Sequence, residues 1–250
     1  MKRKLIAALA CRNQGSRLYG KPLQNLDVNK QIRIIDNIVD CIKSLDCIDD
    51  IVFGISEGVE NEIYKSIASD KRLSFIVGDQ KDVLSRLISC GNVTNATDIF
   101  RVTSESPFLY FNPVSSLWEK HKHEEADATF MDGIIDGCGF EILSMKALEY
   151  SHINGSEKHR SELCSLFIRE NLTKFNVIKG TPPNSLVRKD LRLTVDNPED
   201  LIVCKEVFQE FKDYAPLIPL EKVVRYLDRM PKLKELIAPY VESGYSTMYL

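Results

Sequence analysis

The sequence lacks the features of disordered, membrane-spanning and secreted proteins. It contains a single tryptophan, no low-complexity tract and no long linker rich in glycine, proline and serine. No apolar run approaches the roughly 20 residues that a membrane-spanning helix needs. The run at residues 5–10, which follows the basic start MKRK, is shorter than the roughly 7–15 apolar residues of a signal peptide. We therefore expect a globular, cytoplasmic protein that does not bind membranes.

Cysteine pairs of the C-x-x-C type are also absent. The seven cysteines are odd in number and stand mostly in apolar patterns, which is typical of buried, reduced thiols rather than of a disulfide framework. The four histidines lack the spacing of metal ligands on a helix. We therefore expect no zinc site.

The chain has no overall excess of positive charge, but cations are concentrated near its start. A net charge of -3 and a pI near 5.9 exclude a general basic surface for nucleic acid. Residues 1–30 nevertheless hold seven Lys/Arg and one acid, a local charge of +6, so the remaining 220 residues sum to -9. This concentration indicates a site built for an anion.

Strand-like and helix-like segments alternate along the chain. Short apolar runs predict strands at residues 5–10, 50–55, 73–77, 98–103, 128–131 and 191–195. Helical spacing of apolar residues predicts helices at residues 32–45, 60–68, 82–91 and 113–121. The alternation predicts an α/β fold: a three-layer sandwich in which helices cover both faces of a mostly parallel, mixed sheet. We expect residues 1–250 to form a single domain with a helical tail from about residue 220.

The first predicted strand is followed by a loop that gathers cations among small residues, CRNQGSRLYGKPL at 11–23. Ligands of such sheets bind beyond the carboxyl ends of the strands. Small residues let the backbone approach a ligand and offer free N–H groups to an anion, and Arg12, Arg17 and Lys21 would contact phosphate oxygens. The spacing matches neither the dinucleotide nor the P-loop pattern. A solvated surface loop is the alternative.

Two other predicted strands end in an acid. RVTSESP places Glu105 after one strand, and RLTVDNPED places Asp196 after another. Capping of the next helix explains residues 197–200 without any function, but it does not explain Asp196. Two carboxylates at two strand ends, facing a cationic loop, predict a Mg²⁺ site for a nucleoside triphosphate.

Two further loops have plainer explanations. In GDQKDVLSR, Asp82 would cap a helix and pair with Arg86 one turn later, and this pairing requires no function. In DGCGFEILS, Gly137 and Gly139 precede Glu141 on a predicted strand, so this segment is either a substrate loop or a turn.

These pieces together resemble the nucleotidyltransferases related to the spore coat polysaccharide biosynthesis protein F family, which is itself similar to CMP-sialic acid and CMP-KDO synthetases. The resemblance extends over nearly the whole chain. The segments that carry it, in order, are ACRNQGSRLYGKPL, GDQKDVLSR, RVTSESP, GCGFEILSMKALE, SELCSLFIREN and RLTVDNPEDL.

The resemblance implies a fold of the nucleotide-diphospho-sugar transferase type and transfer of CMP from CTP to a small acceptor, with release of pyrophosphate. Residues matched to the nucleotide site are Ala8, Ala10, Arg12, Gly15, Ser16, Arg17, Lys21, Asp82 and Ser104. Lys21 and Arg12 would also be catalytic, and Mg²⁺ would be the cofactor, bound by Glu105 and Asp196. Residues matched to the acceptor site are Arg86, Glu141 and Glu162.

Three departures from the family pattern concern the site. Glu105 stands where the family has aspartate, Leu163 where it has histidine and Ser161 where it has arginine. They indicate a changed acceptor, and we expect an acidic sugar or a small hydroxy or amino acid used for surface glycans. A phosphorylated acceptor, bound by cations of residues 179–192, is one alternative, and an inactive regulatory member that binds nucleotide is another. A homodimer is compatible with the resemblance.

Overall fold

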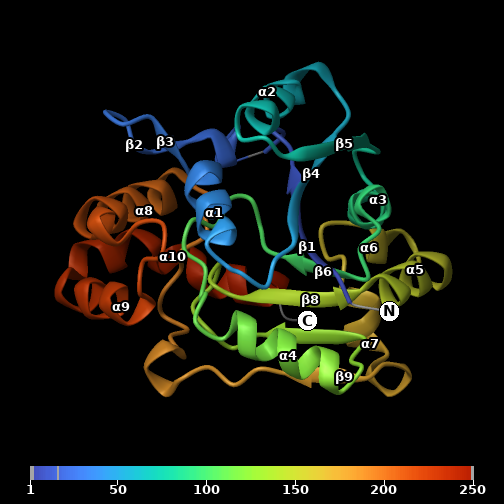
Figure 1. Cartoon of the computed structure of the whole chain (residues 1–250). Coiled ribbons are helices and arrows are strands. Elements are labelled where there is room, and N and C mark those ends of the chain that lie inside the picture. Colours follow the sequence, from blue (N-terminus) through green and yellow to red (C-terminus); the bar gives the residue numbers. More distant parts are fainter. Residues whose placement is uncertain (1–2, 16, 249–250) are drawn as a thin grey trace.

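A seven-stranded sheet forms the centre of the computed structural model, which describes residues 3–15 and 17–248 (Figure 1). From one edge to the other its strands are β5 (Ser74–Gly78), β4 (Asp50–Ser56), β1 (Leu5–Cys11), β6 (Asp98–Arg101), β8 (Phe140–Ser144), β7 (Ala128–Met131) and β9 (Val177–Lys179). β8 is antiparallel to its neighbours β6 and β7, and the other neighbouring pairs are parallel. The prediction of a mostly parallel, mixed sheet is confirmed. Two short strands, β2 (Asn25–Asp27) and β3 (Ile32–Arg33), pair separately.

Helices cover both faces of this sheet. They are α1 (Ile34–Lys43), α2 (Ile63–Asp70), α3 (Val83–Thr94), α4 (Val114–His123), α5 (Met145–Asn154), α6 (Glu157–Arg160), α7 (Leu166–Glu170), α8 (Pro198–Phe211), α9 (Leu220–Arg229) and α10 (Pro231–Met248). Short 3-10 turns are η1 (Lys21–Leu23), η2 (Val59–Asn61), η3 (Leu172–Lys174), η4 (Asn184–Leu186) and η5 (Lys212–Tyr214). Figure 1 shows α1, α8, α9 and α10 on one side of the sheet and α3, α5 and α6 on the other, which confirms the predicted three layers. Across residues 3–15 and 17–248, no helix combines the length and the apolar character needed to cross a bilayer.

The two cores follow from side-chain alternation along the central strand β1. Leu5, Ala7 and Leu9 enter the core beneath α1 and α8, whereas Ile6 and Ala8 enter the core beneath α3 and α5. Successive side chains of a strand point to opposite faces, so a strand buried on both faces is apolar throughout. The run LIAALAC therefore forms a central strand, and its carboxyl end is held where the cationic loop begins.

The chain differs from the sequence prediction at residues 191–195, which form no regular strand. Arg192 makes a single isolated bridge with Asp136. The N–H of Leu193 donates to Asp136 O at 2.8 Å, whereas the N–H of Val195 donates to Glu105 O at 3.1 Å. Because the amides of this segment bond to two different loops, the segment crosses the end of the sheet without joining it. The strand predicted at 98–103 likewise ends early, at Arg101.

Candidate active site

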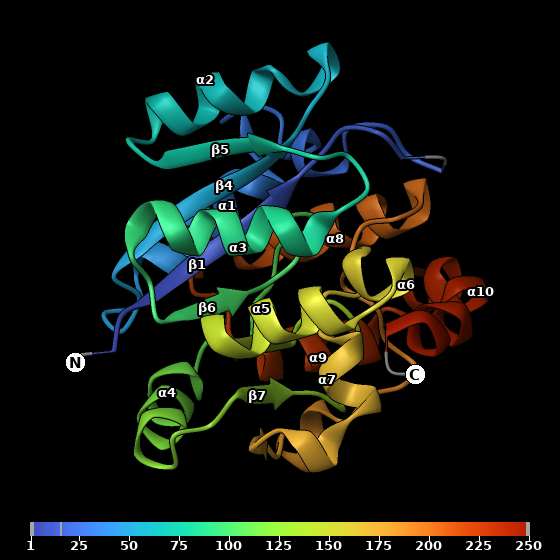
Figure 2. The same cartoon turned by 90° about the vertical axis from the view of Figure 1, so that its right-hand side faces the viewer.

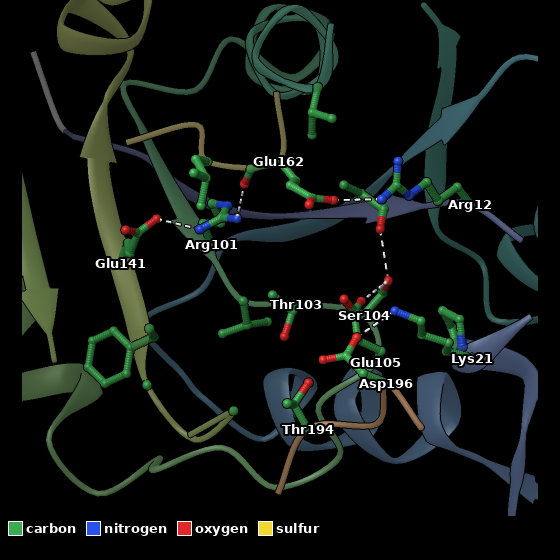
Figure 3. A pocket seen from close by; sticks show the side chains of 18 of the residues that line it. Arg12, Lys21, Arg101, Thr103, Ser104, Glu105, Glu141, Glu162, Thr194 and Asp196 are labelled. Atoms are coloured by element: carbon green, nitrogen blue, oxygen red, sulfur yellow. Dashed lines mark hydrogen bonds and ion pairs between the residues drawn. The ribbon is translucent and has the colours of Figure 1, made fainter. Parts of the chain in front are cut away.

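A cleft of about 430 Å³ opens at the carboxyl ends of β1 and β6. Its wall includes residues from segments far apart in the sequence, within 8–15, 17–22, 83–87, 101–105, 131–141, 162–169 and 192–196. Figure 3 shows side chains from these segments pointing into one space, with Arg12 and Lys21 on one side and Glu141 on the other. The cleft therefore has two ends, one beside the cationic loop and one beside β8.

The cationic loop after β1 is held by its own backbone and by Asn13. The N–H of Gly20 donates to Asn13 O at 2.9 Å, and the N–H of Asn13 donates to Asn61 Oδ1 at 2.8 Å. A Cβ on Gly15 would collide with the carbonyl oxygen of Leu18, so the turn requires glycine. This tight turn brings the cations of the loop to the cleft, where Arg12, Arg17 and Lys21 line the wall.

Two carboxylates, Glu105 and Asp196, meet opposite this loop (Figure 3). The bond from Val195 N to Glu105 O joins the two segments. Lys21 Nζ lies 2.5 Å from Asp196 Oδ1, and a guanidinium nitrogen of Arg17 lies 3.6 Å from the same oxygen. The predicted neighbourhood of two acids and the cationic loop is thus present in the structure.

The two carboxylates differ in their electrostatics. Burial raises the pKa of Glu105, and the charge of Asp196 raises it further, while Lys21 partly offsets both effects. Burial also opposes ionisation of Asp196, but its hydrogen bond with Lys21 and the nearby charges of Arg192 and Arg17 hold its pKa below the ordinary value. Ser104 Oγ donates to Ala10 O at 2.8 Å and to Glu105 Oε2 at 3.3 Å, which fixes the turn that carries Glu105. Glu105 is therefore a half-buried acid whose desolvation and whose repulsion by Asp196 outweigh the attraction of Lys21.

Arg192, a buried residue, forms an ion pair with Asp196 and helps to hold it in place. Its buried guanidinium pairs with Asp136 at 2.7 Å, with Asp200 at 3.0 Å and also with Asp196. Burial, with the neighbouring aspartates, raises the pKa of Asp136 to about 6 although Arg192 opposes this shift. Gly244 of α10 packs directly against Asp136 and Arg192. A Cβ at this position would lie 2.5 Å from Asp136 Oδ2 and closer still to Arg192, so only glycine fits there. The position of Asp196 thus depends on an ion network that the sequence prediction did not include.

The far end of the cleft is organised by Glu141. Register places Glu141 of β8 directly opposite Arg101 of β6, and their side chains pair at 2.7 Å. Arg169 Nη2 donates to Glu141 at 2.8 Å, and Ser165 Oγ donates to it at 2.5 Å. Burial would raise the pKa of Glu141, but the charges of Arg101 and Arg169 lower it to about 2. Arg169 also forms a bidentate pair with Asp132 at 2.6 and 3.0 Å.

Most residues predicted for the site line this cleft. They are Ala8, Ala10, Arg12, Gly15, Arg17, Lys21, Arg86, Ser104, Glu105, Glu141, Glu162 and Asp196. Arg12 and Glu162 reach toward each other and pair at 2.6 Å with exposed side chains. Ser16 lies outside the described residues.

Asp82 does not line the cleft. Its carboxylate accepts the N–H of Ser85 at 2.8 Å, which confirms the predicted helix cap, and it pairs with His152 at 2.8 Å. The predicted pairing with Arg86 is wrong, because Arg86 turns inward and donates to Gly54 O at 2.9 Å. Arg86 is buried, its pKa is lowered by that burial, and within residues 3–15 and 17–248 its Nε has no hydrogen-bond partner.

Sequence comparison finds relatives along nearly the whole chain, although no family model matches. The chain is 24% identical over 244 residues to an uncharacterized protein of Methanocaldococcus jannaschii, covering 97% of this chain and 98% of that protein. It is 22% identical over 232 residues to the spore coat polysaccharide biosynthesis protein SpsF of Bacillus subtilis, covering 91% and 95%. The predicted resemblance is confirmed.

Solved structures share the fold. A cytidylyltransferase from Leptospira borgpetersenii superposes with a TM-score of 0.82 at 18% identity, over 93% of this chain and 97% of that one. A CMP-2-keto-3-deoxy-manno-octonic acid synthetase complexed with CTP superposes with a TM-score of 0.59 at 12% identity, over 83% and 99%. The predicted fold of the nucleotide-diphospho-sugar transferase type is therefore confirmed.

Proposed function

We propose that the protein is a Mg²⁺-dependent cytidylyltransferase that transfers CMP from CTP to a small acceptor and releases pyrophosphate. Similarity to SpsF and the fold shared with a cytidylyltransferase support the reaction class. The presence of CTP in a similar structure supports the nucleotide. The single observation that carries the proposal is the meeting of Lys21, Asp196 and Glu105 at the end of β1.

The cationic loop would receive the triphosphate. Arg12 and Arg17 have exposed guanidiniums that can form paired hydrogen bonds with phosphate oxygens. Lys21 stands between the loop and Asp196, where its charge would neutralise the departing pyrophosphate. One such contact at ~4 Å contributes on the order of 4 kcal/mol at an effective dielectric near 20. Catalysis would thus depend mainly on positioning and electrostatics.

The carboxylate pair fits a divalent cation. Glu105 lies half-buried beside Asp196 and its pKa is raised, so the pair would gain stability from an added positive charge. Mg²⁺ binds through one or two carboxylates together with substrate phosphates. Glu105 and Asp196 would hold it, and it would supply charge to the phosphoryl oxygens. Lys21 and Arg192 would keep Asp196 oriented toward it.

The far end of the cleft would bind the acceptor. Its guanidiniums, Arg101 and Arg169, are matched by the carboxylates of Glu141 and Asp132, so this end carries both signs of charge with little excess of either. That balance supports an acidic sugar or a small hydroxy or amino acid, and it favours those that carry an amino group beside a carboxylate. We propose, from the relation to SpsF, that the product serves surface glycan synthesis. Free cysteines and a CTP substrate support a cytoplasmic location.

A phosphorylated acceptor is less well supported. The cations of residues 179–192 were candidates for its phosphate, but Arg188 pairs with Asp190 and Asp228 at 2.7 Å, away from the cleft lining. Arg192 does line the cleft, yet three aspartates already surround its guanidinium. A phosphate at the acceptor end would meet carboxylates rather than free cations.

Pyrophosphate release tests the proposal. The purified protein is incubated with Mg²⁺, each nucleoside triphosphate in turn, and a panel of sugar acids, amino acids, hydroxy acids and sugar phosphates. We expect release with CTP and one acidic or zwitterionic acceptor. Binding of CTP without turnover of any acceptor would support the regulatory alternative instead.

A matched pair of variants tests the site. Asp196→Asn keeps the shape of the side chain, and we expect it to lower turnover by about 10²–10³-fold while the circular dichroism spectrum stays unchanged. Asp213→Asn, on an exposed turn, serves as the control and keeps full activity. If Asp196→Asn retains activity within a few-fold, the metal assignment is wrong.

A further inference from the structure

The last helix of the chain, α10, packs beside the acids of the cleft. Its buried residues recur at helical spacing, with Leu233 and Ile237 in the apolar core and Gly244 two turns further along. Tyr240 stands between them on the same side of the helix and lies beside Glu199 of α8. Figure 2 shows α10 packed against α8 and α9. The buried side of α10 thus reaches the cleft at Gly244, which lines its wall.

A glycine inside a helix requires an explanation, because glycine is among the residues least suited to that position. At position 244 the neighbouring side chains supply one. A Cβ there would collide with Arg192 Nη1 and would lie 2.5 Å from Asp136 Oδ2. Neither side chain can move aside easily, because both are buried and Arg192 is paired with three aspartates. The close packing of α10 on this ion network therefore depends on glycine.

The atom that Gly244 contacts is linked directly to Asp196. Arg192 Nη1 donates to Asp136 Oδ2 at 2.7 Å, and Nη2 of the same guanidinium pairs with Asp196 Oδ2. Because a guanidinium is rigid and planar, a displacement of Nη1 also moves Nη2. Asp196 belongs to no strand, so side-chain contacts of this kind set its position. A change at Gly244 would therefore be transmitted to the carboxylate of Asp196.

We propose that Gly244 is a positioning residue of the active site. Because it has no side chain, α10 can fix the Arg192 guanidinium, and Arg192 in turn holds Asp196 in the orientation that binds the metal ion. This inference rests on the proposed function, of which the metal site at Asp196 is a part. Residues that hold a metal ligand without touching the metal change metal affinity by about 10–100-fold when they are replaced.

Calorimetric titration of the full chain with CTP tests this role. The affinity for CTP is measured with Mg²⁺ and again with EDTA, and the ratio of the two affinities reports metal binding beside the nucleotide. We expect Gly244→Ala to lower this ratio at least about 10-fold. Its affinity in EDTA should stay within about threefold of wild type, because Arg12 and Arg17 of the cationic loop are untouched. A ratio within about twofold of wild type would overturn the proposal.

A buried glycine of α3 provides the matched control. An added Cβ at Gly91 would also collide with a neighbour, but that neighbour is Met145, which is not among the residues of the cleft wall. Gly91→Ala should therefore lower the melting temperature and keep the wild-type affinity ratio. If Gly91→Ala lowers the ratio as much as Gly244→Ala does, loss of packing alone explains the effect and the positioning role is refuted.

Arg192→Lys tests whether the effect passes through the guanidinium. Lysine keeps the charge but has no Nη1, so an added Cβ at position 244 meets no such collision. Arg192→Lys should lower the affinity ratio by itself, and adding Gly244→Ala should change it by less than about twofold. Losses that simply add would contradict the route through Arg192. If Gly244→Ala alone does not fold, the double variant decides: recovered folding supports the collision with Arg192, and a second failure to fold overturns it.

The wild-type titration separates this inference from the proposed function. Equal CTP affinities with Mg²⁺ and with EDTA would remove the metal from the proposed function, and the role of Gly244 with it. A wild-type protein that gains affinity with Mg²⁺, beside a Gly244→Ala protein that gains as much, would overturn the positioning role alone.

Discussion

Replacing Glu141 by glutamine removes the negative charge that Arg101 and Arg169 share. Glu141 is only 7% exposed, and its carboxylate accepts hydrogen bonds from both guanidiniums and from Ser165. Glutamine has the same shape, so the change removes charge without opening a cavity. The half-buried guanidiniums of Arg101 and Arg169 then lose the negative charge of Glu141. Arg169 keeps its bidentate pair with Asp132.

The magnitude follows from the pKa of Glu141. A fall from the ordinary value of 4.5 to about 2 corresponds to about 3 kcal/mol of folding free energy, at 1.36 kcal/mol per pH unit. Breaking a buried ion pair independently costs about 3–5 kcal/mol, and the retained pair of Arg169 with Asp132 places this case at the lower end. For a chain of 250 residues, the melting temperature should fall by about 6–12 °C.

The sign of the pH dependence is fixed by the same shift. Because folding lowers the pKa of Glu141, its stabilisation is complete above about pH 4.5 and is lost as the pH falls toward about 2. The difference in unfolding free energy between wild type and Glu141→Gln should therefore be about 3 kcal/mol at pH 7. At pH 3 it should be about 1.5 kcal/mol.

Urea denaturation at both pH values measures this difference. Glu149→Gln on the exposed face of α5 is the control, and its unfolding free energy should stay within about 0.5 kcal/mol of wild type. A Glu141→Gln protein as stable as wild type at pH 7 would refute the reasoning. A difference in unfolding free energy that grows as the pH falls would refute it as well.

Three other substitutions have defined outcomes. Lys21→Met should lower turnover by about 10²–10³-fold in the pyrophosphate assay while leaving the unfolding free energy within about 1 kcal/mol, and unchanged turnover would remove Lys21 from the mechanism. Gly137→Ala should lower the unfolding free energy, measured by urea denaturation, by about 1–3 kcal/mol. The reason is that φ of Gly137 is +89° and an added Cβ would lie 2.6 Å from Thr194 N. An unchanged unfolding free energy would contradict that geometry. Asp98→Asn should cost about 3 kcal/mol, measured by thermal unfolding, because Asp98 is fully buried between Arg3 and His121. A loss under about 1 kcal/mol would show that this pair contributes little.

The fold could be predicted because its signals are local. The uninterrupted apolar run of β1 indicates burial on both faces, and apolar spacing indicates α1 over most of its length. The segment at 191–195 carries the same apolar signal, but its residues are buried by loops and helices rather than by neighbouring strands. Hydrophobic patterning reports burial, and it does not report which backbone groups will pair.

The site could be predicted only where a single motif contained the functional residue and also fixed its place in the sheet. The cations after β1 and Glu105 after β6 follow strand ends, so the topology of a parallel sheet brings them together. Asp196 is placed correctly as well, although the segment before it is no strand, because the amides of that segment bond to the same loops. The pairing of Glu141 with Arg101 depends on the register of two strands 40 residues apart, which no local pattern fixes. The inward turn of Arg86 likewise depends on space left by Gly54 and Gly78 on neighbouring strands.

The irregular path of residues 191–195 bears on how the site accommodates the longer side chain of Glu105. Asp196 stands on a stretch of chain that belongs to no strand ladder. Single backbone hydrogen bonds hold this stretch, together with the ion pairs of Asp196 with Lys21 and Arg192. A shift of this stretch by about one carbon–carbon bond would therefore break no strand ladder of the sheet. A longer acid at position 105 could be accommodated by a small movement of the facing segment.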